Sequence, residues 1–315
     1  MAPISYSAKA PGTLMLLGEH AVLHDKTAIV MAVDQWMSVS LNTRIDRKIR
    51  IFSDLGKLEL EISDLKETKI QKPFQFVLAA LQYFEKELKA KKSGFDLNIQ
   101  SEFKHNVGLG SSAAVTVATV AVLFKFLEEF VSFSLEKVRE TAMTIVRKVQ
   151  GMGSGADVAA SVYGGILAYQ QTAPYVLKQL STDLPLTVVY SGSKTPTPEV
   201  VRQVEELENK DPQRINALYK TMDEAAKKAI GLIEQEDWPK LGEIFNSQQD
   251  IMNALGVATP LLNQLCERLN AEPGIYGAKI SGAGLGDCVM GVGAQRMVSN
   301  QTVPVAVSQQ GLHYE

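Results

Sequence analysis

The chain has 315 residues, of which 45% are hydrophobic and 21% charged, an ordinary globular composition long enough for two domains. Its net charge of −3 gives no electrostatic reason to expect a nucleic-acid partner. No apolar run approaches the ~20 residues of a membrane span, and the start lacks a basic region followed by an apolar signal core. The two cysteines, Cys266 and Cys288, are too few for a disulfide framework or for a metal site of their own. We therefore expect no membrane partner and a cytoplasmic location.

The first half of the chain is predicted to combine a sheet with several helices. Apolar and alternating runs predict strands at 4–16, 28–42, 49–52, 58–62, 95–100 and 166–169. Helical spacing of apolar residues predicts helices at 74–88, 113–126 and 135–150. The stretch from Ser53 to Gly56 has turn residues between two short strands, which indicates a hairpin.

The second half is predicted to be mostly helical. The pattern breaks within 170–185, and we place the domain boundary there, with domains at 1–175 and 176–315. A strand at 186–190 is followed by four predicted helices, at 199–208, 213–234, 238–254 and 260–271. A strand, a glycine-rich loop and another strand are then expected around 281–287. Helices alternate with strands in both halves, which favours a two-domain α+β fold.

The ten residues 105–114, HNVGLGSSAA, lie between the predicted strand at 95–100 and the helix at 113–126. Gly108 and Gly110 can adopt positive φ and let the backbone approach a ligand closely. Ser111 and Ser112 fall at the helix start, where unpaired N–H groups and the helix dipole attract an anion. The stretch is neither a Walker A loop nor a dinucleotide fingerprint. It predicts a phosphate-binding loop, and the alternative is a strand-to-helix turn capped by serine.

Two more glycine-rich stretches stand near the ends of the chain. They are KAPGTLMLLGEHAVLH at 9–24 and KISGAGLGDC at 279–288. Together with VGLGSSAA at 107–114, they resemble the three ordered motifs of the GHMP small-molecule kinases. Within that family the motifs most resemble those of mevalonate kinases, with phosphomevalonate kinases next. The resemblance implies an N-terminal domain like ribosomal protein S5 domain 2 and a ferredoxin-like C-terminal domain, with nucleotide and acceptor in the cleft between them.

The resemblance also assigns a nucleotide site, with ATP and Mg²⁺ as the expected cofactors. Ser112 is the residue expected to reach the magnesium ion. The residues expected to contact the nucleotide are Gly108, Leu109, Gly110, Ser111, Ser112 and Ala113 in the second motif and Gly282, Ala283 and Gly284 in the third. Their glycines would let the backbone lie close to the phosphates.

Asp157 is the expected catalytic and substrate-binding carboxylate. It follows Gly153-Ser-Gly-Ala156 and precedes an apolar helix, so we expect it near a helix N-terminus, where the pKa of a carboxyl group tends to fall. The stretch resembles the family's SGxD motif, in which the aspartate faces the acceptor hydroxyl. A normal or lowered pKa predicts a positioning group rather than a strong base. The alternative is an ordinary acid at a helix N-terminus.

The acceptor side is assigned by resemblance too. Glu19 and His20 lie in the glycine turn after the first strand, and His20 could donate to the carboxylate of a hydroxy acid. His24 is a weaker candidate. Lys194, as a catalytic residue, and Thr195, as a substrate-binding one, resemble the C-terminal-domain loop that faces the acceptor and the phosphate.

Two positions depart from the family pattern. Mevalonate kinases carry a lysine where this chain has Thr13, and an acid that contacts Mg²⁺ where it has Val146. We expect another cation to compensate for the lysine, with Lys194 as first choice and Lys9 as second.

The sequence thus favours an ATP-dependent kinase that phosphorylates the primary hydroxyl of mevalonate, in isoprenoid precursor synthesis. Phosphomevalonate is the alternative acceptor. A third hypothesis, motivated by Thr13 and Val146, is a ligand-binding protein that has the kinase fold but little activity. The sequence does not determine the oligomeric state, and a homodimer is kept as an option.

Overall fold

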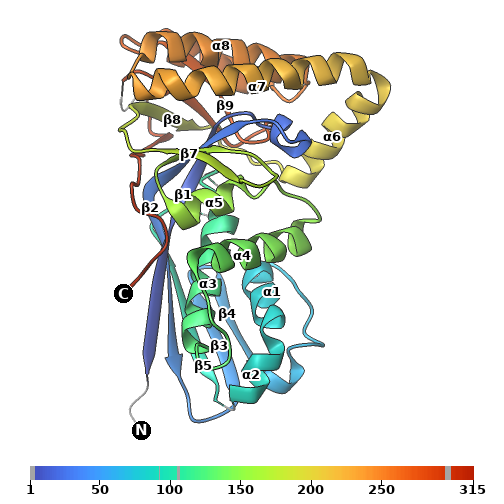
Figure 1. The fold of residues 1–315 in the computed structure, drawn as a ribbon, viewed down its shortest axis with the longest axis vertical. Helices are drawn as coiled ribbons and strands as arrows, with labels where there is room; N and C mark the ends of the chain where they lie inside the picture. The colour runs from blue at the N-terminus through green and yellow to red at the C-terminus, as the bar shows by residue number, and fades with distance from the viewer. Residues whose placement is uncertain (1–3, 92, 105–106, 295–298) are drawn as a thin grey trace.

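The computed structural model describes residues 4–91, 93–104, 107–294 and 299–315. His105 and Asn106, the first two residues of the ten-residue stretch 105–114, lie outside the described residues. The chain forms an elongated molecule with a large sheet at one end and a smaller sheet, covered by long helices, at the other (Figure 1). The expected two-domain α+β fold is confirmed.

Strands and helices alternate along much of the chain. The described strands are β1 Ser5–Leu17, β2 Ala28–Thr43, β3 Lys48–Ser53, β4 Gly56–Glu61, β5 Phe95–Ser101, β6 Ile166–Tyr169, β7 Val176–Leu180, β8 Leu186–Tyr190, β9 Gly277–Ser281, β10 Cys288–Val292, β11 Thr302–Val303 and β12 His313–Tyr314. The described α-helices are α1 Gln75–Tyr83, α2 Glu85–Lys91, α3 Ser111–Phe126, α4 Leu135–Gln150, α5 Ala156–Tyr163, α6 Thr197–Lys210, α7 Pro212–Glu234, α8 Trp238–Ala254 and α9 Pro260–Asn270. Two short 3₁₀ helices, η1 Ala21–His24 and η2 Ile62–Asp64, complete them.

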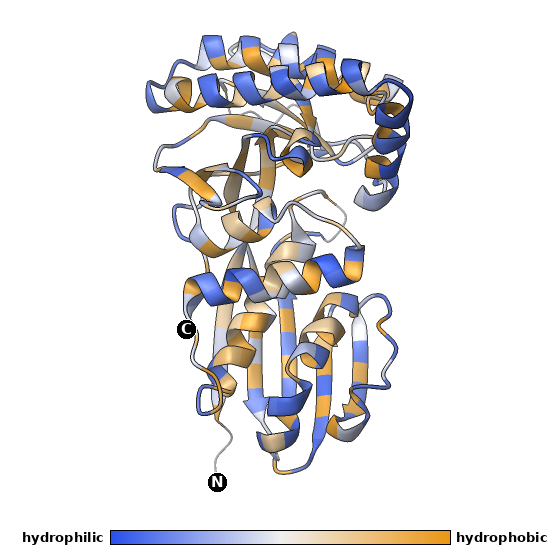
Figure 2. Ribbon diagram, turned by 45° about the vertical axis from the view of Figure 1, so that its right-hand side comes forward, coloured by the Kyte–Doolittle hydropathy of each residue, from blue (hydrophilic) through white to orange (hydrophobic). Residues whose placement is uncertain are grey.

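The large sheet has the strand order β12-β1-β2-β5-β3-β4, with β6 on β2 and β7 on β6. Among the described pairs of neighbouring strands in this sheet, β3 and β5 are parallel and all the others are antiparallel. Apolar and polar residues alternate along its strands (Figure 2), as expected for a sheet that buries one face. Helix α3 packs on that face and is buried along almost its whole length. Because α3 begins with the serines of the second motif, this burial fixes the position of the predicted phosphate loop.

The smaller sheet has the order β11-β8-β10-β9 and is antiparallel throughout. Helices α7 and α8 lie side by side, and α8 and α9 pack on the sheet (Figure 1). These helices start where the sequence has helix-start signals: Asp211, Asp237 and Thr259 each cap the first turn, and a proline follows within two residues. None of the described helices is both long and apolar enough to cross a membrane.

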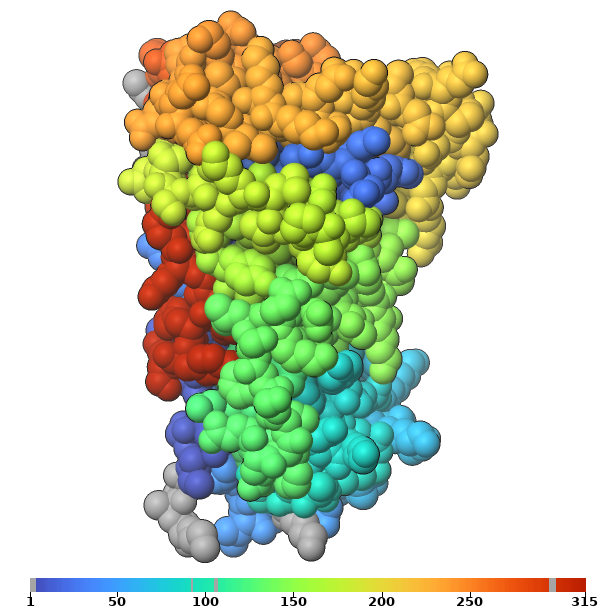
Figure 3. All heavy atoms as spheres, in the orientation of Figure 1, coloured from blue at the N-terminus to red at the C-terminus, as the bar shows by residue number. Residues whose placement is uncertain are grey.

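Some elements differ from the sequence prediction. The helix expected at 74–88 is two helices, α1 and α2, separated at Phe84, whose φ of −97° and ψ of 17° are not helical. Strands β7, β11 and β12 were not predicted. Strands β11 and β12 have two residues each and pair with strands that are distant in the sequence, whereas β7 pairs with the preceding strand, β6. The domain boundary near 175 stays a proposal. In the structure β7 still pairs with β6, and the C-terminal residues return to β1 along the larger domain (Figure 3).

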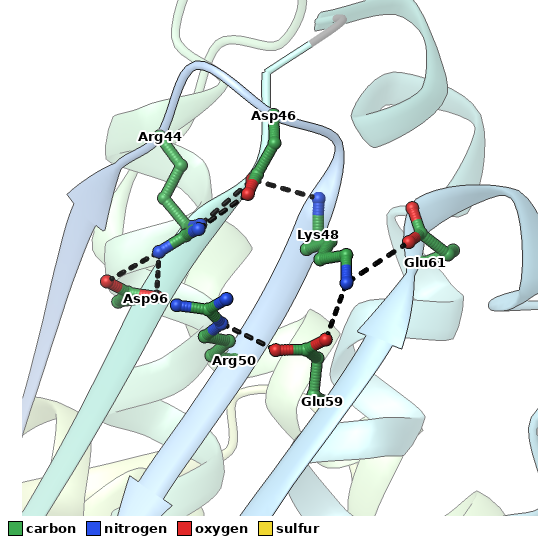
Figure 4. A network of polar contacts seen from close by, with 7 residues as sticks. All are labelled: Arg44, Asp46, Lys48, Arg50, Glu59, Glu61 and Asp96. Atoms are coloured by element: carbon green, nitrogen blue, oxygen red, sulfur yellow. Dashed lines mark hydrogen bonds and ion pairs between the residues drawn. The ribbon is translucent and has the colours of Figure 1, made fainter.

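The outer end of the large sheet carries a network of ion pairs (Figure 4). Arg44 contacts both Asp46 and Asp96, while Lys48 and Arg50 contact Glu59 from the neighbouring strand. The Arg44 guanidinium lowers the pKa of Asp46 to about 2. These groups are solvated, and exposed ion pairs contribute little to stability, so the network is a feature of the surface rather than a binding site.

Candidate active site

The three glycine-rich motifs meet in one pocket. The Thr13 N–H donates to the Leu109 carbonyl (3.1 Å), which joins the first motif to the second. The Ser281 hydroxyl donates to the Met15 carbonyl (3.1 Å), which joins the third motif to the first. The Cys288 thiol donates to the Val107 carbonyl (3.0 Å), which joins the third to the second. Residues of all three motifs, of α4, α5 and α6 line the cavity between the two sheets. The convergence expected from the sequence is confirmed.

The second motif has the geometry of an anion-binding loop. Gly108 and Gly110 have φ of 75° and 59°, which favours glycine. A Cβ on Gly110 would lie 1.9 Å from the Thr13 Oγ1, so any other residue here would displace the Thr13 side chain. Helix α3 begins at Ser111, and Ser111, Ser112 and Ala113 line the pocket. The helix N-terminus therefore faces the cavity, as predicted.

Leu109 contributes in a different way from its neighbours. Its side chain is buried in the core, and its carbonyl accepts from Thr13. Any contact of this residue with a nucleotide would therefore come from its backbone N–H.

Asp157 lies in the first turn of α5, after Gly155 with φ of 89°. The Thr13 hydroxyl donates to its Oδ1 at 2.7 Å. Burial raises the pKa of Asp157, and this effect exceeds the lowering caused by Thr13 and by Lys194. The sequence-based expectation of a normal or lowered pKa is therefore wrong, because the desolvation of the carboxyl group in the cleft outweighs the stabilisation of its charge by the helix terminus.

His20 lies at the turn between β1 and η1, with a φ of 61°, and is 5% exposed. Its Nε2 is 2.8 Å from the Ala283 carbonyl oxygen, and burial lowers its pKa. The neutral ring must carry its proton on Nε2, because a carbonyl only accepts. Nδ1 then remains as an acceptor. This geometry opposes the expected donation from His20 to a substrate carboxylate.

Glu19 also lines the pocket, but both of its oxygens are engaged within the protein. Its Oε1 accepts from Lys279 Nζ at 2.5 Å, and its Oε2 accepts from the Gln248 amide at 3.2 Å. All three side chains are buried. This arrangement favours a bracing role for Glu19 between β1 and the C-terminal domain over direct contact with substrate.

Lys279 was not among the residues predicted from the sequence. The signal was available, however. A lysine inside the apolar run of β9 needs a buried acid as partner, and the first motif contains one.

The loop after β8 brings Lys194 to the pocket but not Thr195. The Thr195 hydroxyl donates to the Leu285 carbonyl at 2.6 Å and so ties this loop to the third motif. Thr197, two residues further on, lines the pocket instead. Lys194 Nζ lies 3.8 Å from Asp287 Oδ1. Lys194 is the one lysine or arginine among the described residues that line the cavity.

The two departures from the family pattern lie in the same cavity. Thr13 and Val146 both line it. Lys9, the second choice to replace the missing lysine, instead pairs with Glu315 at 2.6 Å and does not line the pocket. His24 stacks on Tyr219 with ring centroids 4.4 Å apart and is likewise outside the lining. Neither residue can contribute to the chemistry from its place in this structure.

Comparison with known families gives two matches. Residues 75–165 match the family described as GHMP kinases N terminal domain, and residues 229–301 match GHMP kinases C terminal. Among curated proteins, the mevalonate kinase of Pyrococcus abyssi is 32% identical over an alignment that covers 98% of this chain and 97% of that protein.

Solved structures share the fold. The mevalonate kinase of Methanococcus jannaschii superposes with a TM-score of 0.75 at 25% identity, covering 91% of this chain and 90% of that one. A Streptococcus pneumoniae phosphomevalonate kinase, in complex with phosphomevalonate and AMPPNP, has a TM-score of 0.72 at 18% identity, with 93% and 92% covered.

A cleft that joins a helix N-terminus in a glycine-rich loop to a buried carboxylate is suited to phosphoryl transfer between small molecules. The chain belongs to the GHMP kinases, and it is an ATP-dependent kinase.

Proposed function

We propose that this kinase transfers the γ-phosphoryl group of ATP to the primary hydroxyl of mevalonate, a step of isoprenoid precursor synthesis. The observation that carries the proposal is the near full-length similarity to a protein named mevalonate kinase, at 32% identity. The motifs that resemble the family's include Asp157 and the phosphate loop, and residues of both line the pocket.

In this proposal Asp157 orients the acceptor hydroxyl and takes its proton. The new bond forms between the acceptor oxygen and the γ-phosphorus, the bond to the bridging oxygen breaks, and ADP leaves. The raised pKa of Asp157 makes its carboxylate a better proton acceptor than a solvated aspartate. The Thr13 hydroxyl holds Oδ1 and so fixes the plane of the carboxylate.

The lining residues fit a nucleotide with its metal ion. The start of α3, the glycines of the second motif and Gly282 of the third line the pocket and offer backbone N–H groups for phosphates, whereas Gly284 packs against Val257 outside the lining. The Ser112 hydroxyl and the Asp287 carboxylate are hard oxygen donors of the kind that Mg²⁺ prefers. Bound Mg²⁺ would neutralise charge on the phosphates.

The charges of the pocket favour mevalonate over phosphomevalonate. A phosphorylated acceptor adds about two negative charges beside those of ATP and of Asp157. Among the described lining residues only Lys194 supplies a side-chain cation, since burial keeps His20 neutral. One observation favours phosphomevalonate instead: the GDC sequence at 286–288 resembles the same part of the third motif in phosphomevalonate kinases.

Steady-state turnover with ATP separates the candidates. Mevalonate and phosphomevalonate would each be tested with the wild-type protein, and an Asp157→Asn preparation would control for contaminating kinases. We expect kcat/KM for mevalonate to exceed that for phosphomevalonate by at least about 100-fold.

Two outcomes would contradict the proposal. Faster turnover of phosphomevalonate would assign the second acceptor. Measurable nucleotide binding without turnover of either acceptor would favour a ligand-binding protein, the hypothesis motivated by Thr13 and Val146.

A further inference from the structure

Asp287 is a carboxylate in the pocket to which neither the sequence nor the family likeness gave a role. It lies in the turn between β9 and β10, and its side chain is 13% exposed. A Cβ placed on Gly108 would come within 3.1 Å of the Asp287 Cβ and 3.2 Å of its Oδ1. The carboxylate is therefore in contact with the phosphate loop, although it comes from the other domain.

The protein holds the backbone of Asp287 by hydrogen bonds but leaves one oxygen of its side chain without a hydrogen-bond donor. The Asp287 N–H donates to the Ser193 carbonyl at 2.8 Å, and its own carbonyl accepts from the Ser191 N–H at 2.9 Å. Its φ is 63°, a left-handed conformation fixed by these two bonds. The Oδ1 atom is inaccessible to solvent and accepts no hydrogen bond from any described residue. Lys194 Nζ, at 3.8 Å, is too far for one.

Burying a carboxylate oxygen without a hydrogen-bond donor costs free energy in the folded state, unless a bound ligand interacts with that oxygen. A cation would satisfy this oxygen, and it would also offset the repulsion between the carboxylate and the triphosphate that the loop binds. Asp157 is a further acid in the same cavity, and the third, Glu19, is paired with Lys279. Lys194 alone among the described lining residues therefore faces the charges of Asp157 and Asp287. ATP would increase this excess of negative charge, which a divalent ion brought with the nucleotide would offset.

The family's usual acid for that ion is missing. Val146 stands at that position, on α4, and offers only methyl groups. Among the described residues no group of three or more His, Cys, Asp or Glu side chains could hold a metal ion by itself. The ion must therefore depend on the phosphates for some of its ligands.

We propose that Asp287 is the carboxylate through which this chain binds the nucleotide's divalent cation, in place of the acid absent at Val146. The carboxylate thus reaches the ion from the third motif, in the C-terminal domain, rather than from α4. The proposal concerns the ATP side of the site and does not depend on which acceptor is phosphorylated.

The test is Mn²⁺ binding measured by electron paramagnetic resonance in the presence of saturating AMP-PNP. Asp287→Asn keeps the shape of the side chain, and asparagine tolerates the left-handed backbone. We expect this variant to bind Mn²⁺ at least about tenfold more weakly than the wild type. The affinity for AMP-PNP without metal should be unchanged or higher, since a negative charge has been removed.

Asp157→Asn is the matched control, because it removes the same charge from the same cavity. An equal loss of Mn²⁺ affinity in both variants would mean that Asp287 attracts the ion only by its negative charge and does not ligate it. That result would overturn the proposal. So would an unchanged Mn²⁺ affinity in a folded Asp287→Asn protein, since Asp287 would then serve only to position Lys194. Turnover of mevalonate is measured separately, so failure of this inference and failure of the proposed acceptor are distinguishable.

Discussion

Asp157 sits beside a hydroxyl where related kinases are expected to have a lysine, and this changes the chemistry available to it. A neighbouring ammonium would hold the pKa of the carboxyl group down, whereas the Thr13 hydroxyl only partly opposes the effect of burial. The result is a carboxylate with a raised pKa, suited to accept a proton from the acceptor.

The pH dependence of kcat/KM should report this pKa. The base must be deprotonated, so activity falls as the pH drops through the raised pKa of Asp157. Thr13→Val removes the hydrogen bond that lowers the pKa, and we expect the acidic limb to move to higher pH. Thr13→Ser keeps the hydroxyl and should leave the limb in place. Asp157→Asn should lower kcat by about 100-fold or more and abolish the limb.

A limb that is identical in Thr13→Val and in the wild type would show that the hydrogen bond does not control the titrating group. A limb that persists in Asp157→Asn would assign it to another residue.

At the level of single residues, the sequence identified those that belong to a motif and missed those defined by distant partners. Asp157 was found because its neighbours form a recognisable pattern. The direction of its pKa was not, because burial depends on the whole cleft. Asp287 was seen only as part of a loop, since its contact with Gly108 joins two motifs that are far apart in the sequence.

At the level of elements, the join between β1 and β9 depends on a buried ion pair. Lys279 is fully buried, and Glu19 and Gln248 surround it from the first motif and from α8. The turn that contains Glu19 also contains His20, whose ring hydrogen-bonds to the Ala283 carbonyl in the third motif. The pair therefore holds two motifs in register.

Breaking this pair should destabilise the protein strongly. Lys279→Met leaves Glu19 as a buried charge without a partner, and we expect a loss of about 3–5 kcal/mol in the free energy of unfolding by urea. The double variant Glu19→Gln, Lys279→Met should recover much of that loss. Lys178→Met, which breaks the exposed pair with Glu234, is the matched control and should have little effect. Equal stabilities of Lys279→Met and the control would show that the pair is not needed.

Elements with strong local signals were predictable and those with distant partners were not. Helices α7, α8 and α9 were predicted almost to the residue because caps and prolines mark their starts. The two-residue strands β11 and β12 exist only through pairing with β8 and β1. No local pattern distinguishes them from loop.

In the whole molecule, the pocket belongs to neither domain alone. The first and second motifs come from the large sheet and its helix α3, and the third motif comes from the small sheet. The family resemblance implied this cleft, and composition or periodicity alone could not have placed it. A ligand that contacts both sides should therefore stabilise both domains together.

Hydrogen exchange with and without Mg²⁺ and AMP-PNP tests this coupling. A ligand that binds only the closed, folded site slows exchange by a factor that approaches the ratio of free ligand to Kd, about 100-fold at 100 Kd. We expect such protection in both 107–114 and 281–287, because both segments line the pocket. The hairpin of β3 and β4, which carries part of the ion-pair network (Figure 4) and does not line the pocket, should be the unaffected reference. Protection confined to 107–114 would mean that the third motif does not contact the nucleotide and that the two domains bind it independently.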